Sequence, residues 1–298
     1  MLSGILAGLA AGALWGLVFV APRMAAGFSS VDLTAGRFVA YGLVAFAVTL
    51  FGWRTRRRPT GAQALAAVGM SLLGFTGYYL LLVLAIRDAG TEVPTLVIGT
   101  IPIWVMLLGK PGELRWAALA PGIVLTAAGL VLMMAGEPGP ASAGAAGSHY
   151  WRGIAFVLAS LACWTAFALL NSAWLKRHPE VNATDWANWL GLATGAGALV
   201  LWGVAGSDAA ALQAQPGLGL FLLLCVGTGF GSAWLATILW NVASQRLSAS
   251  LCGQLIVSET LFALLYSFLW DGRWPTLAQG AAAVLFTLGI LASIKAHR

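Results

Sequence analysis

Charged residues are scarce in this chain of 298 residues: Asp, Glu, Lys and Arg make up 9% of it, whereas 60% is hydrophobic, with a mean hydropathy of +0.87. A soluble domain of this length carries about 25% charged residues. The shortage excludes an ordinary water-soluble fold, a disordered chain and a nucleic-acid-binding protein. The net charge of +6 lies between the apolar runs, so membrane topology explains it better than an acidic partner does.

Residues that form disulfides or bind metals are also few. The three cysteines lie inside apolar runs without a CxxC pair, and the three histidines lie far apart in loops or at the terminus. The acidic residues are scattered singly, and the sequence contains no GxxxxGK[ST] motif. We therefore expect no disulfide framework, metal site or cofactor, no ATP-hydrolysing domain within the chain, and no catalytic residues.

Long apolar runs are what the chain has instead. Each is close to the roughly 20 residues that a helix needs to cross a hydrocarbon core about 30 Å thick. Strict alternation is absent, and backbone groups in lipid must be satisfied within their own segment, so each run is predicted to be a helix. The sequence predicts an all-α integral membrane protein with ten transmembrane helices at 4–22, 31–53, 62–86, 92–109, 116–136, 151–174, 185–206, 217–240, 249–270 and 275–296.

Lys and Arg residues outside these spans set the predicted orientation. Ten spans place both termini on one side, and a cytoplasmic location of that side puts 11 Lys and Arg inside and 4 outside. The basic cluster Arg54–Arg58 contributes most of this excess. Positive charge is retained on the cytoplasmic side of membrane proteins. We therefore expect a multi-pass protein of a bacterial inner membrane with both termini in the cytoplasm.

The chain also contains an internal repeat. An offset of 158 residues aligns Arg115-Trp116-x-x-Leu119-Ala120-x-Gly122 with Arg273-Trp274-x-x-Leu277-Ala278-x-Gly280, and an offset of 149 aligns Trp15 with Trp164. Five spans per half is an odd number, so the second half must cross the membrane in the opposite sense. We predict inverted five-helix repeats at 1–136 and 151–298, joined by a periplasmic linker at 137–150. Such repeats are typical of alternating-access transporters, with a site near the midplane between the halves.

These features resemble those of one known family, the EamA type of the drug/metabolite transporter superfamily. The resemblance rests on the two five-helix halves and on four local features: Trp15-Gly16, Thr100-Ile101-Pro102, the small-residue stretch Ala243–Ser250, and Ser258-Glu259-Thr260. Family members often have Glu-Pro where this chain has Glu259 followed by Thr260. The resemblance covers nearly the whole chain and implies a secondary transporter. Within the superfamily the chain is most similar to bacterial amino-acid exporters, including the aromatic amino-acid branch.

The fourth span is short and contains two prolines. Pro102 removes a backbone donor and clashes with the carbonyl four residues earlier, so backbone oxygens near it can be freed toward a cavity. We predict a hinge at Pro94 and Pro102 and substrate contacts from Gly99, Thr100 and Ile101. The alternative is a packing kink that neighbouring helices support.

Glu259 is the only acidic residue clearly at mid-depth, where a carboxylate is costly unless it is paired or protonated. It can carry a proton, bind a substrate ammonium group, or hold two helices together. Ser258 beside it is a further candidate for substrate binding. Arg37 lies a few residues into the second span, and we expect it to snorkel to the outer surface as a structural residue.

The eighth span carries four side chains with polar groups on one helical face: Trp234, Thr237, Asn241 and Ser244. We predict that they line the cavity; alternatively, they hydrogen-bond between helices. The offset of 158 aligns Tyr79 with Thr237, so Tyr79 is expected to face the same cavity. Tyr78, also a candidate, lies about 100° away around the helix.

Trp15 and Trp164 are repeat equivalents that lie well inside the first and sixth spans. A substrate ammonium or aromatic group can stack on such indole rings. The alternative is symmetric core packing, and Asn171 further along the sixth span is a weaker polar candidate. The first span also has a run of glycines at GxxxG spacing, which predicts close helix packing: Gly4, Gly8, Gly12 and Gly16.

The sequence thus predicts a secondary transporter that exports amino acids or related small metabolites around a central cavity, by proton coupling or by facilitated diffusion. Its expected partners are the small-molecule substrate and the lipid bilayer, and we expect it to act as a monomer. The alternatives are a multidrug or nucleotide-sugar-type exchanger on the same scaffold and, more distantly, an integral-membrane enzyme acting on lipid intermediates.

The predicted orientation is testable by cysteine-accessibility labelling. Single cysteines at positions 140–147 should react with an impermeant reagent in intact cells, because that segment is predicted to be periplasmic. Cysteines at positions 55–58 should react only after permeabilisation. Labelling of positions 55–58 in intact cells would reverse the orientation.

Overall fold

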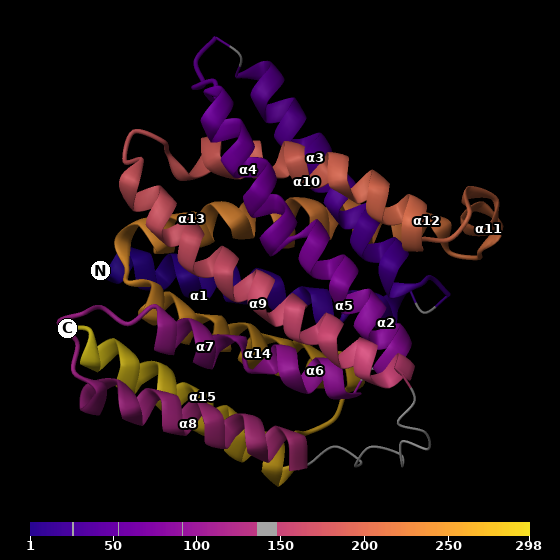
Figure 1. The fold of residues 1–298 in the computed structure, drawn as a ribbon. Helices are drawn as coiled ribbons and strands as arrows, with labels where there is room; N and C mark the ends of the chain where they lie inside the picture. Colours follow the sequence, from indigo (N-terminus) through magenta and orange to yellow (C-terminus); the bar gives the residue numbers. More distant parts are fainter. Residues whose placement is uncertain (26, 53, 91, 136–147) are drawn as a thin grey trace.

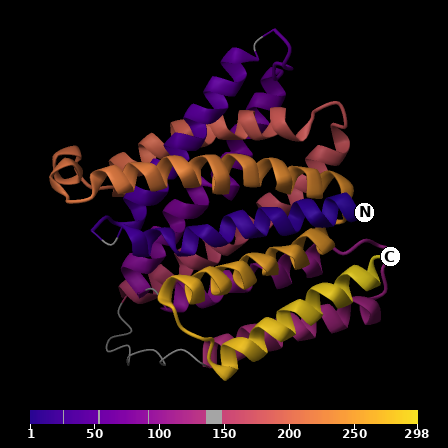
Figure 2. The ribbon, with the colours of Figure 1, turned by 180° about the vertical axis from the view of Figure 1, so that it is seen from behind.

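The computed structural model describes residues 1–298 except 26, 53, 91 and 136–147 (Figure 1). In the described part the chain is helical and contains no strand. Both termini lie at the same end of the molecule, and α8 and α15 lie side by side at the edge opposite α3 and α4 (Figure 1). Seen from behind, α1 lies between α13 and α14 (Figure 2).

Helices account for most of both halves. The first half contains α1 (Leu2–Gly16), the 3₁₀ turn η1 (Leu17–Phe19), α2 (Ala21–Met24), α3 (Ser30–Phe51), α4 (Gly61–Gly74), α5 (Thr76–Ala89), α6 (Glu92–Gly99), α7 (Ile101–Leu108) and α8 (Trp116–Ala135). The second half contains α9 (Ser148–Arg177), α10 (Ala183–Ala205), α11 (Ala209–Ala214), α12 (Leu218–Thr228), the π-helical turn η2 (Gly229–Leu235), α13 (Ala236–Arg246), α14 (Ala249–Asp271) and α15 (Leu277–Ala296).

Nine segments of the described chain are long and apolar enough to cross a membrane, one fewer than the ten predicted. The predicted span at 92–109 forms two short helices, α6 and α7, whose apolar stretch Val93–Leu108 falls below the length of the others. α9 begins at Ser148 and therefore takes in the end of the predicted linker at 137–150. The rest of that linker, 137–147, lies outside the described residues.

The exterior of the helices is apolar, and many polar side chains are buried inside. Phe51 is 90% exposed and Leu269 is 72% exposed, whereas Asn171, Thr194 and Gln254 have no exposed surface. A soluble protein exposes polar groups and buries apolar ones. Apolar side chains are expected on the outside where lipid surrounds the helices, and buried polar groups can bind one helix to the next.

The glycines of α1 make the close packing that their spacing predicted. A Cβ atom on Gly12 would lie 2.1 Å from the Ser258 Oγ, and one on Gly16 would lie 2.9 Å from the Ala263 backbone nitrogen. Gly8 meets Leu255 of α14 in the same way, and Gly4 meets Leu247 just before that helix. The prediction of close packing at Gly4, Gly8, Gly12 and Gly16 is confirmed.

Glycines also bring helices of the two halves together at three other interfaces. A Cβ atom on Gly42 of α3 would lie 2.7 Å from the Gly195 Cα of α10. Gly129 of α8 meets the Phe286 ring of α15, and Gly253 of α14 meets Val105 of α7. Each interface joins a helix of the first half to one of the second half.

Three predicted spans are interrupted along their length. The third breaks at Phe75, between α4 and α5, where the backbone has φ −132° and ψ −91°. The fourth breaks at Thr100, and the eighth contains the π-helical turn η2. α14 is continuous through Glu259 and Thr260, because Thr260 keeps the backbone N–H that a proline would remove.

The α3–α10 interface gives a test of this packing. Gly42→Ala should lower the free energy of unfolding by about 1–3 kcal/mol, because the added methyl group meets the backbone of α10 and forces the helices apart. Thermal unfolding of the purified protein in detergent measures the loss. The matched control is Gly69→Ala in α4, where a Cβ atom would meet nothing within 4 Å and the change should be neutral or slightly stabilising. Equal effects of the two substitutions would contradict the interface.

Candidate functional site

Tryptophans from three helices meet between the halves. The rings of Trp15 in α1 and Trp164 in α9 lie with their centroids 5.3 and 6.3 Å from that of Trp240 in α13. Trp240 is 1% exposed, and its indole N–H has no hydrogen-bond partner among the described residues. Trp15 and Trp164 each keep a partly exposed surface. The repeat equivalents therefore pack against one core residue and also keep surface on which a ligand can stack.

Arg37 does not reach the outer surface as we expected from the sequence. Its guanidinium carbon lies 4.8 Å from the Phe38 ring centroid, and its Nε is buried without a hydrogen-bond partner in the described structure. The Arg37 charge interacts electrostatically with Glu259 of α14 and with Tyr78 and Tyr79 of α5. Sequence reasoning missed this arrangement because nothing in the spacing of Arg37 indicates the helix that it faces.

The two tyrosines of α5 face different neighbours. Tyr79 donates a hydrogen bond of 3.0 Å from its hydroxyl to the Ser30 carbonyl, and its ring meets Phe38 edge-on at 6.4 Å. Tyr78 packs against the core cluster that contains Trp240, as do Trp15 and Trp164. It also interacts electrostatically with Glu259. Tyr78 thus lies near both the charged groups and the tryptophans, and the expectation that Tyr79 faces the cavity stays a prediction.

The polar stripe of the eighth span lies mostly within the protein core. Thr237 is 2% exposed, and Asn241 and Ser244 have no exposed surface. The Ser244 carbonyl accepts a hydrogen bond from Ser172 of α9. Trp234 remains partly exposed and donates a 2.8 Å hydrogen bond to Asn188 of α10. The Asn241 side chain bonds to α9 and α10, which favours the inter-helix alternative for this residue, whereas the Ser244 hydroxyl is buried without a hydrogen-bond partner in the described structure. Substrate binding by the stripe stays a prediction.

A chain of hydrogen bonds explains the buried asparagines. The Trp186 indole donates to the Asn171 Oδ1 at 2.7 Å, and the Asn171 amide donates to the Asn241 Oδ1 at 3.2 Å. The Asn241 amide in turn donates to the Ala183 carbonyl at 3.3 Å. The chain joins α9, α10 and α13 and has no exposed side chain. Asn171, predicted as a weak substrate contact, therefore has its side-chain groups bound to other helices.

The short fourth span is interrupted where its prolines suggested. Thr100 separates α6 from α7, and its hydroxyl donates a 2.6 Å hydrogen bond to the Val97 carbonyl. Gly99 and Thr100 are partly exposed, whereas Ile101, Pro94 and Pro102 are buried. A hinge role for the prolines and substrate contacts from 99–101 stay predictions. Ser258 is 1% exposed, and its hydroxyl donates to the Leu255 carbonyl at 2.7 Å, beside Gly12 of α1.

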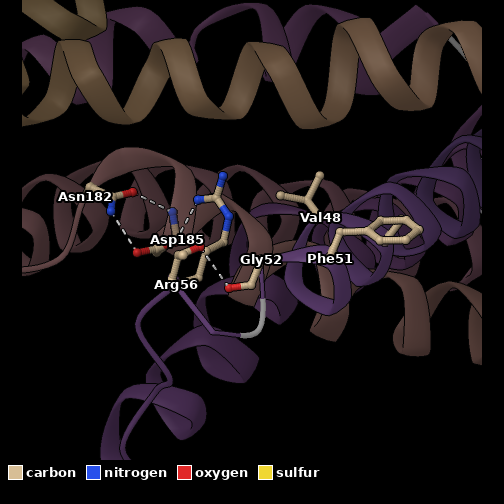
Figure 3. Close-up of a pocket in the computed structure, with 8 residues that line it drawn as sticks. Val48, Phe51, Gly52, Arg56, Asn182 and Asp185 are labelled. Atoms are coloured by element: carbon tan, nitrogen blue, oxygen red, sulfur yellow. Dashed lines mark hydrogen bonds and ion pairs between the residues drawn. The ribbon is translucent and has the colours of Figure 1, made fainter.

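A pocket of about 520 Å³ lies apart from this cluster, at the ends of α3 and α10 (Figure 3). Arg56, from the loop after α3, forms an ion pair of 2.9 Å with Asp185 of α10. Asp185 also accepts a 2.7 Å hydrogen bond from the Asn182 side chain, the N-cap of α10. An N-cap followed three residues later by an acid is readable in the sequence, but the Arg56 partner is not.

A related contact holds the start of α3. Ser29 is the N-cap of this helix, and Asp32 follows three residues later. Asp32 accepts hydrogen bonds of 2.7 Å from both the backbone nitrogen and the hydroxyl of Ser207, in the loop after α10. Each acid therefore fixes a loop of the other half. In the described residues, no three His, Cys, Asp or Glu side chains come close enough to hold a metal ion.

Comparison with known proteins agrees with this architecture. A model of the EamA-like transporter family matches residues 2–135. The inner membrane protein YtfF of Escherichia coli (strain K12) is 30% identical over 308 residues, an alignment that covers 99% of this chain and 96% of YtfF. The chain belongs to the EamA-like transporter family. A protein of known crystal structure has the same fold, with a TM-score of 0.79 at 21% identity over 99% of this chain and 97% of its own.

Membership of the EamA-like family confirms the resemblance drawn from the local motifs. It makes the chain a multi-pass membrane protein of the drug/metabolite transporter superfamily, and it agrees with a transport role in place of an enzymatic one. The family match says nothing about which small molecule is moved, so that part of the prediction has to be argued from the site.

The asparagine chain predicts a structural phenotype. Asn241→Ala should lower the free energy of unfolding by about 1–3 kcal/mol, because it leaves the Asn171 amide and the Ala183 carbonyl unpaired in the core. Thermal unfolding in detergent measures the loss of stability. The amount of folded protein and the transport activity should fall in proportion to one another. Asn171→Ala combined with Asn241→Ala should cost less than the sum of the single losses, since the two residues share one bond.

A specific loss of transport would contradict this interpretation. If Asn241→Ala keeps a normal amount of folded protein with unchanged thermal stability and still fails to transport, Asn241 acts on the substrate. Trp186→Phe tests the other end of the chain: it removes the N–H that donates to Asn171 together with part of a fully buried ring, so it should also lower the stability.

Proposed function

We propose that the protein is a secondary transporter that exports amino acids, aromatic or neutral ones above all, or related small metabolites across the bacterial inner membrane. Transport proceeds by alternating access around a cavity between the halves. The observation that carries the proposal is the meeting of partly exposed charged and aromatic side chains from α1, α3, α5, α9 and α14 inside otherwise apolar spans. Ionisable groups inside membrane spans mark substrate or ion pathways.

The packing of the helices supports two inverted five-helix repeats, 1–136 and 151–298. Helices at matching positions in the two halves pack on one another: α3 on α10, α7 on α14, and α8 on α15. Two further contacts are equivalent under the proposed repeat, in which α1 corresponds to α9 and α5 corresponds to α13. α1 packs on α13, and α9 packs on α5. A pseudo-two-fold axis in the membrane plane generates these pairings.

Polar contacts at the two ends of the molecule support the same symmetry. Asp185 at the start of α10 and Asp32 at the start of α3 hold loops of the opposite half in corresponding ways. Arg152 of α9 pairs with Asp88 of α5, and the corresponding places in the other half hold Ser3 and Arg246, which are hydrogen-bonded. Both helix packing and individual side-chain contacts therefore support the proposed repeat.

For the remaining features, the proposal keeps the sequence-based predictions. Both termini lie in the cytoplasm, the linker 137–150 lies in the periplasm, and the protein works as a monomer in the lipid bilayer. The only partner required is a small-molecule substrate, and the family's transport role leaves no need for catalytic residues or a cofactor. A tenfold difference in affinity between two neutral amino acids corresponds to about 1.4 kcal/mol of binding free energy, which a few side-chain contacts supply.

Transport by purified protein in liposomes is the direct test. Vesicles loaded with unlabelled phenylalanine, leucine or alanine should take up the same labelled amino acid by exchange, and vesicles without protein should not. Because Glu259 has no second acid or histidine beside it in the sequence of its span, we expect facilitated diffusion. An imposed pH gradient should then leave the final level of label unchanged.

Two results would contradict parts of this proposal separately. Concentration of label against its gradient when a pH difference is imposed would show proton coupling and overturn facilitated diffusion alone. Failure of protein-containing vesicles to exchange any of the three amino acids would overturn the amino-acid substrate class.

A further inference from the structure

Two opposite charges lie unpaired inside the membrane spans, Arg37 in α3 and Glu259 in α14. Neither forms an ion pair within 4.0 Å or a side-chain hydrogen bond anywhere in the described structure. The described ion pairs of this protein lie instead at the ends of helices or in loops. An unpaired charge in a span is costly, and two that persist together point to a missing partner.

The two charges lie on separately packed helices, one of which contacts α1 and the other the turn η2, which itself contacts α1. α14 packs on α1, α7 and α15, and the backbone nitrogen of Glu259 lies beside Gly12 of α1. α3 packs on α10, α12 and η2, where the Arg37 carbonyl lies beside Gly229. The charges interact electrostatically without meeting. Both side chains are partly exposed.

Tyr78 connects this charged pair to the tryptophans. Its phenol interacts electrostatically with both Arg37 and Glu259, and its ring packs against the cluster that holds Trp15, Trp164 and Trp240. A ligand between the charges therefore has aromatic surface within reach on one side. Aromatic rings stack with other rings and with aliphatic groups, so they can contact an uncharged ligand side chain of either kind.

We propose that Arg37 and Glu259 together bind the zwitterionic head group of an α-amino acid, with the carboxylate on Arg37, the ammonium group on Glu259 and the side chain toward Trp15 and Trp164. This assignment rests on the proposed function and specifies its substrate class. The planar guanidinium presents parallel donors that match a carboxylate, and Glu259 accepts from an ammonium group. No covalent step is involved.

The arrangement selects for a molecule that carries both charges at once. An amine neutralises Glu259 and leaves Arg37 unpaired, whereas a carboxylic acid neutralises Arg37 and leaves Glu259 unpaired. Either ligand therefore brings its own desolvation cost without satisfying the site. A site that leaves a buried polar group unpaired rejects such analogues strongly.

Equilibrium binding to the purified full-length protein in lipid nanodiscs tests the assignment. Titration calorimetry compares L-phenylalanine with phenethylamine, which lacks the carboxylate, and with 3-phenylpropionate, which lacks the ammonium group. Wild type should bind phenylalanine at least about tenfold more tightly than either analogue. Wild-type affinities that are equal for phenylalanine and one of the analogues would overturn the proposal, as would no binding of phenylalanine.

Two charge-neutral variants assign the individual contacts. Arg37→Gln should lose the preference for phenylalanine over phenethylamine and keep the preference over 3-phenylpropionate. Glu259→Gln should lose the preference for phenylalanine over 3-phenylpropionate and keep the preference over phenethylamine. If both variants weaken all three ligands by the same factor, or change none, Arg37 and Glu259 act on each other or on the fold and the proposal is wrong.

Matched controls remove one positive and one negative charge from exposed loops. Arg54→Gln and Glu113→Gln alter residues outside the spans and should leave all three dissociation constants unchanged. If Arg37→Gln does not fold, Arg37→Lys keeps the charge and removes the planar fork. Arg37→Lys should weaken phenylalanine binding and leave phenethylamine binding unchanged, and equal changes for the two ligands would overturn the carboxylate contact.

Failure of this site and failure of the transport function give different results. A wild type that exchanges phenylalanine in liposomes but binds phenethylamine equally well remains a transporter, and the zwitterion site is wrong. A wild type that exchanges no amino acid overturns the proposed function, and the site falls with it.

Discussion

The close approach of helix backbones at glycine is the constraint on which the rest of this structure depends. Lipid tails are as apolar as leucine, so hydrophobic burial does not hold helices together in a membrane. Packing and inter-helix hydrogen bonds have to do so, and both need short distances between backbones. Gly42 against Gly195 and Gly12 against Ser258 supply those distances across the two halves. They also fix α3 and α14, the helices that carry Arg37 and Glu259, without requiring contact between the two charges.

The polar groups within this framework divide into those that have hydrogen-bond partners in the described structure and those that do not, and the proposed site uses two of the second kind. Asn171 and Asn241 are fully buried and bonded along a chain from Trp186 to Ala183, so they connect helices and leave nothing for a ligand. Arg37 and Glu259 are partly exposed and bonded to nothing within the described structure. Position in the sequence does not distinguish the two pairs, because all four residues lie within apolar spans. The presence or absence of hydrogen-bond partners does distinguish the two pairs.

Hydropathy and periodicity predicted the helical membrane fold and the glycine packing of α1, because both depend on residue types within one segment. The fourth predicted span, 92–109, is not a single helix, since Thr100 interrupts it between Pro94 and Pro102. The site was harder to predict. Spacing places Thr237, Asn241 and Ser244 on one face, but it does not say whether that face meets a cavity or α9 and α10. Arg37 was misjudged for the same reason: its neighbours Tyr78 and Glu259 are distant in sequence.

Contacts at the ends of the molecule have to be exchangeable if the halves rock around a central site. Arg23 with Asp271, and Arg152 with Asp88, join the halves through arginines that are nearly half exposed. Exposed pairs of this kind contribute about 0.2–1 kcal/mol each, so thermal motion opens them readily. Arg56 with Asp185 differs, because the carboxylate side chain is only 4% exposed. Breaking that pair leaves a nearly buried charge, so opening at this end requires water or substrate to enter as the pair separates. Because the glycine interfaces also join helices of the two halves, rocking of the halves around Arg37 and Glu259 would have to alter these interfaces together with the end contacts.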